Sequence, residues 1–460
     1  MSNCFKEYKS YFLVGTGGAG MSAIAIVLKG MGYKVSGSDI KESRYVNLLR
    51  NEGIKIYIGH RKENIVGFDA VVYSTAIPRD NIEILAAKEK NIPIFSRSDI
   101  LASILNSRKA IAVTGTHGKT TTTSMISLIF RGLDLDPTII IGGELNELGS
   151  NARFGEGDYV IAEACESDGS FLKYKPFVGV ITNIEEDHLD YYKSFENLSR
   201  SFIKFVENTK TGGLVVINGD EVKLNDIIGR KDRKIICYGI GKKNDIYAEN
   251  IKISNFTSSY SLIIKKGNKK KKIDVKLNVP GIYNIKNSLA ALAVCYGMEM
   301  NMEKAVEILK FFTGIKRRFE KRGEKNGALI FDDYAHHPTE IKVTLEAANA
   351  EKRDRIITIF QPHRYTRLQN LYNKFNDCFN NSDIVVITDV YGAGEQPLPG
   401  ITGKLLLNNL IDGGFKNRIV YIPRLQDICK YLELNMREND IVLLMGAGDI
   451  TRVTEELLKN

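Results

Sequence analysis

Short runs of apolar, largely β-branched residues recur along the chain, and each is followed by a turn and then by a helical pattern. The runs are Tyr11–Val14, Ala110–Thr114, Tyr159–Ala162, Val178–Thr182, Ile356–Phe360, Ile384–Thr388 and Ile441–Met445. Strands that alternate with helices predict an α/β fold, with parallel sheets covered by helices on both faces. Ligands bind beyond the carboxyl ends of such strands, so functional residues should follow these runs directly.

Two polar interruptions divide the chain into segments of domain size. One is the link Asn106–Lys109, and the other is Gly314–Arg318, which follows a helical stretch at Met302–Phe312. Because one core rarely serves more than roughly 250–300 residues, a chain of 460 residues also suggests about three domains. We expect domains at residues 1–106, 107–316 and 317–460.

Composition and charge exclude several classes of protein. Apolar residues make up 43% and charged residues 26%, which argues against a disordered or collagen-like chain. The net charge of +9 permits anionic metabolites or nucleic acid without requiring either. The N-terminus does not fit a signal peptide, no apolar run is long enough to cross a bilayer, and the cysteines form no CxxC pair. We expect a soluble, cytoplasmic protein with reduced thiols and no membrane insertion.

Lysines gather at Lys265–Lys272, between the alternating runs Tyr260–Ile264 and Ile273–Leu277. This pattern favours the solvated tip of a β-hairpin. A nucleic-acid-binding patch is the alternative, but no aromatic residues are interleaved with the lysines. We therefore expect no nucleic-acid partner.

The first strand runs into the glycine loop Gly15–Gly20, which fits G-x-G-x-x-G and precedes a helical pattern at Ser22–Lys29. Such glycines allow close approach of a diphosphate, and a helix N-terminus favours the anion. Asp39 ends the next strand, where its carboxylate could bind a ribose or a base. The motif predicts a nucleotide without identifying it. NAD is the default candidate, and a tight turn without a ligand is a further alternative.

A second loop, Gly115–Thr121, lies between the run Ala110–Thr114 and a helical pattern at Lys119–Arg131. It is shorter than G-x-x-x-x-G-K-[ST], because Val113 stands where the outer glycine would be. Backbone N–H groups could still cradle phosphates, Lys119 could neutralise them, and the Thr120 hydroxyl could bind Mg²⁺. We predict an ATP site, which a dehydrogenase would not need.

Acidic clusters follow two more strands, in Ala162–Asp168 and Thr182–Asp190. Mg²⁺ prefers oxygen ligands, usually one or two carboxylates together with waters and phosphates. Glu163 is the best candidate for a first ligand, and His188 could complete a second site. We interpret Glu185 and Glu186 as residues that cap helices.

Histidines and arginines gather in the last third of the chain. His336 and His337 lie in Asp332–Pro338, after the strand Ala328–Phe331, and His363 precedes two arginines. Arg364 and Arg367 could clamp a carboxylate through bidentate hydrogen bonds. For His363, a surface ion pair is an equal alternative.

These segments together resemble the Mur ligases of peptidoglycan synthesis. The shared segments are GTHGKTTT, AEACESD, TNIEEDHLD, GIYNIKN, RRFE, DDYAHHPTE and FQPHRYTR, and the resemblance runs from Gly15 to about Asp449. GTHGKT alone marks a wider superfamily that includes folylpolyglutamate synthases. The GTGGAGM loop with DDYAHHPTE and QPHRYTR is most similar to the members that act on UDP-N-acetylmuramate (UDP-MurNAc) and L-alanine.

The resemblance implies an N-terminal Rossmann-like domain for the UDP-sugar, a central P-loop ATPase domain and a C-terminal Rossmann-like domain for the amino acid. It implies that ATP phosphorylates the lactyl carboxylate of UDP-MurNAc. The amine of L-alanine then attacks the acyl phosphate, giving an amide, ADP and phosphate. The resemblance leaves the oligomeric state open between a monomer and a dimer.

The resemblance and the chemistry together assign roles to residues. We expect catalysis to involve Lys119, Glu163, His188 and His336. We expect the metal to be bound by Thr120, Glu163 and His188. His336 should bind or deprotonate the amine, since the pKa of an imidazole suits that task. ATP should contact Gly115, Thr116, His117, Gly118, Lys119, Thr120, Thr121, Asn284, Asn287, Arg318 and Asp333. The UDP-sugar and alanine should contact Gly17, Gly18, Ala19, Gly20, Asp39, His60, Ser74, Thr75, Tyr334, His336, Arg364 and Arg367.

Two positions depart from the family pattern. Cys165 replaces an acidic residue that is usual in the motif AExDESD, and Tyr283 stands where a histidine often precedes Asn284. The first departure concerns the surroundings of Glu163, and the second concerns the packing of adenine.

Three classes of function compete. An NAD-dependent oxidoreductase leaves Gly115–Thr121 unexplained, and a nucleic-acid-binding protein would show a steep salt dependence of binding. Among ligases, one that recycles murein tripeptide or adds another amino acid is the runner-up. The combination of Arg364 and Arg367 with Tyr334 and His336 favours a small amino acid.

Overall fold

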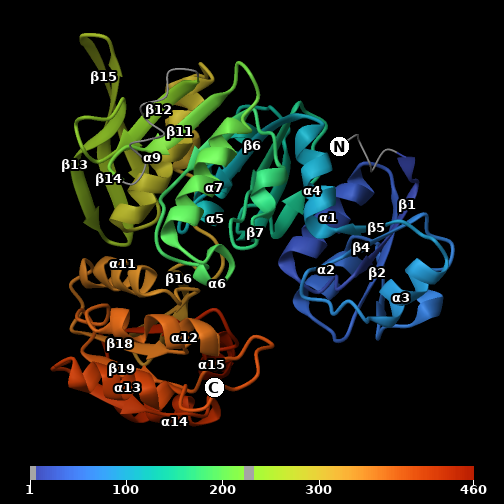
Figure 1. Ribbon diagram of the computed structural model, residues 1–460. Helices are drawn as coiled ribbons and strands as arrows, with labels where there is room; N and C mark the ends of the chain where they lie inside the picture. Colours follow the sequence, from blue (N-terminus) through green and yellow to red (C-terminus); the bar gives the residue numbers. More distant parts are fainter. Residues whose placement is uncertain (1–6, 222–232, 460) are drawn as a thin grey trace. The chain divides into compact units, whose positions relative to one another are not determined.

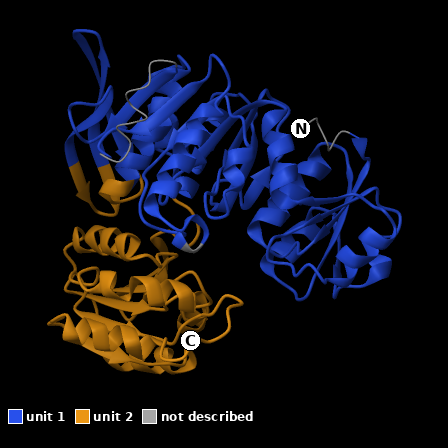
Figure 2. Ribbon diagram, in the orientation of Figure 1, with its two compact units in different colours: residues 1–251, 259–277, 284–313 blue, residues 252–258, 278–283, 314–460 orange. Residues whose placement is uncertain are grey.

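The computed structural model describes residues 7–221 and 233–459, with three β-sheets and their helices (Figure 1). The chain divides into two compact units, which Figure 2 shows in blue and orange. Unit 1 comprises residues 1–251, 259–277 and 284–313, and unit 2 comprises residues 252–258, 278–283 and 314–460. The predicted α/β fold is confirmed, whereas the domain boundaries after residues 106 and 316 stay predictions.

The first sheet of unit 1 is parallel, with the strand order β3-β2-β1-β4-β5. Its strands are β1 (Ser10–Val14), β2 (Lys34–Asp39), β3 (Lys55–Ile58), β4 (Ala70–Tyr73) and β5 (Ile94–Ser96). Its helices are α1 (Ala19–Gly30), α2 (Arg44–Asn51), η2 (Lys62–Ile65), α3 (Ile82–Glu89) and α4 (Arg97–Asn106). The chain leaves β1 with β2 on one side and β4 on the other, the arrangement at which nucleotides bind to such sheets.

The second sheet of unit 1 has ten strands in the order β15-β14-β13-β12-β11-β10-β6-β9-β7-β8. They are β6 (Lys109–Thr114), β7 (Thr138–Leu145), β8 (Ser150–Arg153), β9 (Tyr159–Glu163), β10 (Val178–Ile181), β11 (Leu214–Asn218), β12 (Lys234–Gly239), β13 (Ile246–Ser254), β14 (Thr257–Lys266) and β15 (Lys269–Leu277). The helices are α5 (Lys119–Gly132), η3 (Ser170–Lys173), α6 (Leu189–Tyr192), α7 (Phe195–Glu207), α9 (Ile282–Gly297) and α10 (Met302–Leu309). Strand β6 lies between β9 and β10, and all three pair in parallel, so their carboxyl ends meet at one edge.

The predicted hairpin at the lysine cluster is confirmed, but its extent was wrong. Strands β14 and β15 are joined by residues 267–268 alone, and Gly267 has the positive φ that such a tight turn requires. Lys269–Lys272 therefore lie within β15, the edge strand of the sheet. Lysines on an edge strand discourage pairing with another chain, which is sufficient reason for the cluster.

The two sheets of unit 1 share one hydrophobic core. Buried residues of α1, such as Ile24, belong to the same cluster as Ile140 of β7 and Ala152 of β8. The side-chain amide of Asn151 donates to the carbonyl of Ala19 at 2.6 Å, and thereby ties β8 to the first turn of α1. The first glycine loop is thus anchored on the second sheet as well as on its own.

The sheet of unit 2 has the order β16-β17-β21-β18-β19-β20, in which β16 alone is antiparallel to its neighbour. Its strands are β16 (Glu320–Lys325), β17 (Ala328–Asp333), β18 (Arg355–Phe360), β19 (Ile384–Ile387), β20 (Arg418–Tyr421) and β21 (Asp440–Met445). The helices are α11 (Pro338–Asn349), α12 (Tyr365–Leu371), η5 (Tyr372–Phe375), α13 (Gly403–Asp412), α14 (Gln426–Asn435) and α15 (Thr451–Lys459). Alternate residues of β17 enter two separate hydrophobic clusters, as expected for a sheet with two buried faces.

No helix between residues 7 and 221 or between 233 and 459 has the length and apolar character needed to cross a membrane. Free thiols are found at Cys165, Cys237, Cys295, Cys378 and Cys429. Cys4 lies outside the described residues.

Candidate active site

The first glycine loop joins β1 to α1, as predicted. The Gly17 N–H donates to Asp39 Oδ2 at 2.7 Å, and a Cβ at Gly17 would lie 2.7 Å from the same oxygen. Gly18 is the N-cap of α1 and lies beside open space, and a Cβ at Gly20 would lie 2.8 Å from the guanidinium of Arg97. The positively charged side chain of Arg97, which we did not predict as a site residue, therefore lies beside a loop suited to a diphosphate.

The other residues expected at the UDP-sugar site follow neighbouring strands of the same sheet. Ser74 and Thr75 follow β4, and the Ser74 N–H donates to the carbonyl of Val14 at 3.3 Å. His60 follows β3 on the opposite side of β1, and its Nδ1 lies 2.7 Å from Glu83 Oε2. All these residues lie at one edge of the sheet, although their contacts with a ligand stay predictions.

The second loop joins β6 to α5, as predicted for a phosphate loop. Gly118 has a φ of +81°, and a Cβ there would lie 2.5 Å from Oδ1 of Asn287. The His117 N–H donates to Asn183 Oδ1 at 2.9 Å, and the Thr182 hydroxyl donates to the carbonyl of His117 at 2.6 Å. The end of β10 therefore holds the loop, a support that the sequence did not reveal.

Lys119, the first residue of α5, points back across this loop. Its ammonium donates to the carbonyls of Gly115 and Thr116 and lies 3.0 Å from Oε1 of Glu166. Burial alone would lower the pKa of Lys119, but Glu166 and, more weakly, Glu163 raise it, and the net pKa lies above its ordinary value. The lysine is therefore charged where phosphates would bind.

Glu166 is the main residue of this site that the sequence did not identify. It is 2% exposed, and Nε2 of His188 lies 3.7 Å from the carboxylate oxygen that also faces Lys119. Its other oxygen, Oε2, is buried and has no hydrogen-bond partner within the described residues. The only sequence signal was its place three residues after Glu163 in the same acidic segment.

Glu163 ends β9, as predicted, and Oε1 accepts a hydrogen bond from the Gly142 N–H at 2.9 Å. Its charge is felt at Lys119. The unsatisfied Oε2 of Glu166 and the carboxylate of Glu163 are oxygen donors of the kind that Mg²⁺ prefers. The assignment of Thr120, Glu163 and His188 as metal ligands stays a prediction.

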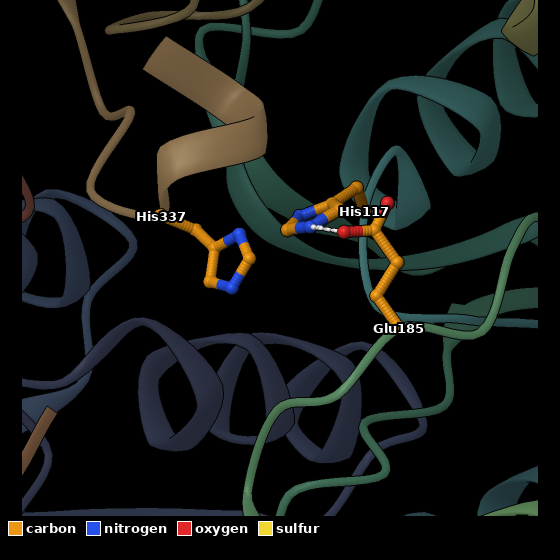
Figure 3. A group of neighbouring side chains, drawn as sticks. All are labelled: His117, Glu185 and His337. Carbon is orange, nitrogen blue, oxygen red and sulfur yellow. Dashed lines mark ion pairs between the residues drawn. The ribbon is translucent and has the colours of Figure 1, made fainter. Parts of the chain in front are cut away.

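The interpretation of Glu185 and Glu186 as helix caps was wrong. The nearest helix, α6, begins at Leu189, so neither residue lies in its first turn. The Glu185 carboxylate instead lies 3.5 Å from Nε2 of His117 (Figure 3). Figure 3 also labels His337, which belongs to unit 2 and caps α11.

Asn284 and Asn287 are both buried on α9. The Thr122 hydroxyl donates to Oδ1 of Asn287 at 3.3 Å, which places this amide against the phosphate loop. The expected contacts of both residues with adenine stay predictions.

The two departures from the family pattern have different surroundings. Sγ of Cys165 lies 3.1 Å from the Ser167 hydroxyl, and burial followed by the charge of Glu166 raises the pKa of the thiol. Tyr283 packs over Gly281: an added Cβ at Gly281 would lie 2.4 Å from the Tyr283 ring, and the φ of +100° disfavours a side chain as well. Because its pKa is raised, the Cys165 thiol is protonated near neutral pH.

In unit 2, Asp333 ends β17 and is 4% exposed. It accepts hydrogen bonds from the N–H groups of Phe319 and Ala335 at 2.7 and 2.6 Å. Burial, only partly offset by Arg318, raises the pKa of Asp333 to about 6. The Arg318 guanidinium lies over the Tyr334 ring and 3.4 Å from Glu340.

The protonation of His336 follows from its neighbours. Its Nδ1 lies 2.9 Å from the carbonyl of Tyr334 and 3.4 Å from the Glu340 carboxylate, and both of these groups only accept hydrogen bonds. Nδ1 therefore carries the proton, and Nε2 of the neutral ring is an acceptor. Burial lowers the pKa of His336 to about 4, so the expectation of an ordinary imidazole pKa was wrong. The ring is suited to accept a hydrogen bond rather than to remove a proton from an ammonium group.

His363 has the opposite tautomer. Arg367 donates from Nη1 to Nδ1 of His363 at 2.9 Å, so Nε2 carries the proton. Burial, then His336 and Arg367, lower the pKa of His363 to about 3, and the ring stacks on Tyr391. A surface ion pair is therefore the wrong reading of His363. Arg364 is exposed and lies 4.0 Å from Glu395.

Three models of known protein families match nearly the whole of the chain. The family model described as "Mur ligase family, catalytic domain" matches residues 11–109, and the family model described as "Mur ligase middle domain" matches residues 113–295. "Mur ligase, glutamate ligase domain" matches residues 317–448. The chain belongs to the Mur ligase family. Membership explains both phosphate loops, which an NAD-dependent oxidoreductase did not.

Full-length relatives of this Mur ligase have been named as UDP-N-acetylmuramate–L-alanine ligases. That of Desulforamulus reducens is 44% identical over 99% of this chain and 98% of its own length. That of Pelotomaculum thermopropionicum is 42% identical over 97% and 96%. The crystal structure of UDP-N-acetylmuramate-alanine ligase MurC from Thermotoga maritima matches with a TM-score of 0.83 and 30% identity, covering 98% of both chains.

Proposed function

We propose that this Mur ligase joins L-alanine to the lactyl carboxylate of UDP-MurNAc, with conversion of ATP to ADP and phosphate. The observation that carries this proposal is full-length similarity to ligases of that name, at 44% identity over 99% of the chain. The reaction makes a peptidoglycan precursor, and we place it in the cytoplasm. The proposed domains are residues 1–106 for the UDP-sugar, 107–316 for ATP and 317–460 for the amino acid.

The chemistry begins with a carboxylate, which is a poor electrophile. Transfer of the γ-phosphoryl group of ATP gives an acyl phosphate, so that phosphate can later leave. Two anions must approach each other in this step, and positive charge between them lowers the barrier. Lys119 supplies that charge, since Glu166 holds its ammonium at the phosphate loop. The loop residues Gly115, Thr116, His117, Gly118, Thr120 and Thr121 surround the phosphates.

Thr120, Glu163 and His188 would hold Mg²⁺, which neutralises phosphate charge when it is bound. Support comes from the oxygen donors described above and from the unpartnered Oε2 of Glu166. Asn284, Asn287, Arg318 and Asp333 would contact the rest of ATP.

The amine must attack in its neutral form. His336, whose Nε2 is an acceptor, would bind an N–H of the amine, while Arg364 and Arg367 would hold the alanine carboxylate. Tyr334, whose ring lies 5.5 Å from that of His336, would bound the space for a small side chain. Gly17, Gly18, Ala19, Gly20, Asp39, His60, Ser74 and Thr75 would bind the UDP-sugar.

The test is phosphate release from ATP in the presence of UDP-MurNAc and one amino compound at a time. We expect release with L-alanine, none when either co-substrate is omitted, and loss of activity with EDTA that returns with Mg²⁺. No release with L-alanine, glycine or L-serine would refute the specific assignment. Release with murein tripeptide alone would instead identify a recycling ligase.

A further inference from the structure

A buried carboxylate lies behind the proposed UDP-sugar site. Glu83, on α3, is fully buried and accepts hydrogen bonds from Ser38, His60, Asn64 and the N–H of Arg61. Burying an ionised carboxylate is costly unless hydrogen bonds compensate. If Glu83 served only to attach α3 to the sheet, none of these donors would need to be an imidazole.

The contacts fix the tautomer of His60. Nδ1 lies 2.7 Å from Glu83 Oε2 and 3.1 Å from the Ser38 oxygen. The Ser38 hydroxyl donates its hydrogen to Glu83 Oε2 at 2.6 Å, so its oxygen can only accept a hydrogen bond from His60. Nδ1 must therefore carry a proton, and in the tautomer with that single proton Nε2 is an acceptor. Within the described residues, Nε2 has no hydrogen-bond partner.

Strand order places His60 relative to a bound nucleotide. The loop after β1 suits the diphosphate, and the acidic residue that ends β2, here Asp39, is the one that meets a ribose in this fold. The base then extends towards β3, the strand that His60 follows. Ile40 and Ile58, 69% and 39% exposed beside Asp39 in the β2–β3 register, offer apolar surface for such a ring.

We propose that Glu83 is a positioning residue that holds His60 as the acceptor for the N3–H of uracil. Cytosine has a lone pair instead of a proton at N3, so the same geometry selects UDP-sugars over CDP-sugars. The proposal rests on the proposed UDP-sugar site and adds the origin of its base specificity.

The test is calorimetric binding of UDP and of CDP to the full-length protein. We expect wild type to bind UDP at least about tenfold more tightly than CDP, the value of one good hydrogen bond. Glu83→Gln should lose about tenfold in UDP affinity and narrow the ratio of UDP to CDP affinity. Adding His60→Ala to Glu83→Gln should weaken UDP binding no further than His60→Ala alone.

Asp69→Asn is the matched control. Asp69 also accepts several hydrogen bonds, but at the amino end of β1, so UDP binding should be unchanged. Failure of wild type to bind UDP would overturn both the UDP-sugar site and this proposal. Binding of UDP with no preference over CDP, additive losses in the double variant, or an unaffected Glu83→Gln would overturn the role of Glu83 alone.

A measurement on wild type covers the case in which Glu83→Gln does not fold. Imidazole ¹⁵N shifts of His60, assigned by comparison with His60→Gln, should report a neutral ring protonated at Nδ1. A ring protonated at Nε2, whether alone or together with Nδ1, would overturn the proposal.

Discussion

The ammonium of Lys119 lies 3.0 Å from a carboxylate oxygen of Glu166, and the glutamate is almost completely buried. Each member of the pair depends on the other, because an ionised group left alone in such surroundings is strongly destabilising. The pair holds the lysine at the phosphate loop before any nucleotide arrives.

Glu166→Ala should therefore lower the free energy of unfolding by about 3–5 kcal/mol, since it leaves a buried ammonium unpaired. Urea unfolding measures this loss. The double variant Lys119→Met with Glu166→Leu should regain most of it. A loss below about 1 kcal/mol in the single variant would be typical of a surface pair instead.

Lys119→Ala should abolish ATP turnover, because no other cation of the loop replaces its charge on the transferred phosphoryl group. Phosphate release in the presence of all substrates is the measurement. Lys109→Ala, at the first residue of β6, the strand that leads into the loop, is the control and should keep wild-type activity. Retained activity in Lys119→Ala would refute the phosphate-loop assignment.

Gly118→Ala should weaken ATP binding more than it weakens the fold. Gly118 and Gly212 have positive φ angles of +81° and +75°, but only Gly118 has a neighbour, Asn287, within 4 Å of an added Cβ. The backbone strain should cost about 1–2 kcal/mol at either position. Nucleotide binding should fall in Gly118→Ala and stay normal in Gly212→Ala. Equal ATP affinity in the two variants would contradict the tight fit against Asn287.

Asp333 should make unit 2 less stable as pH rises from about 4 to 6. Its pKa is raised from 3.8 to about 6, so the folded state binds the proton more tightly than the unfolded state in this window. The free energy of unfolding falls as that proton is lost, by about 3 kcal/mol in total. Asp333→Asn should remove this slope, which melting curves at pH 4 and pH 7 would reveal. An identical pH dependence in both proteins would contradict the raised pKa.

The features that follow from local pattern could be predicted from the sequence. Asp39 and Glu163 lie at strand ends and Lys119 begins a helix, as predicted, because apolar runs and glycine turns determine where a strand stops. The pairing of Lys119 with Glu166 could not be predicted, since it depends on β6 lying beside β9 in the sheet. That neighbour relation is set by packing of the whole unit.

Protonation states were equally inaccessible. The pKa of His336 depends on burial and on a carbonyl two residues away, and that of His363 on an arginine one helical turn later. The role of Glu185 was misread because its partner, His117, is distant in sequence. Composition of a segment identifies candidate groups, whereas their charges require the surroundings.

The core that α1 shares with β7 and β8 has a consequence for how unit 1 responds to heat. Buried residues from both sheets belong to one hydrophobic cluster there, so both sheets should melt in one cooperative transition. A uridine nucleotide bound at the first loop would then protect the ATP-binding sheet from unfolding as strongly as its own. Hydrogen exchange in β6 and β9 would slow on addition of UDP, although neither strand touches the nucleotide in the proposed site.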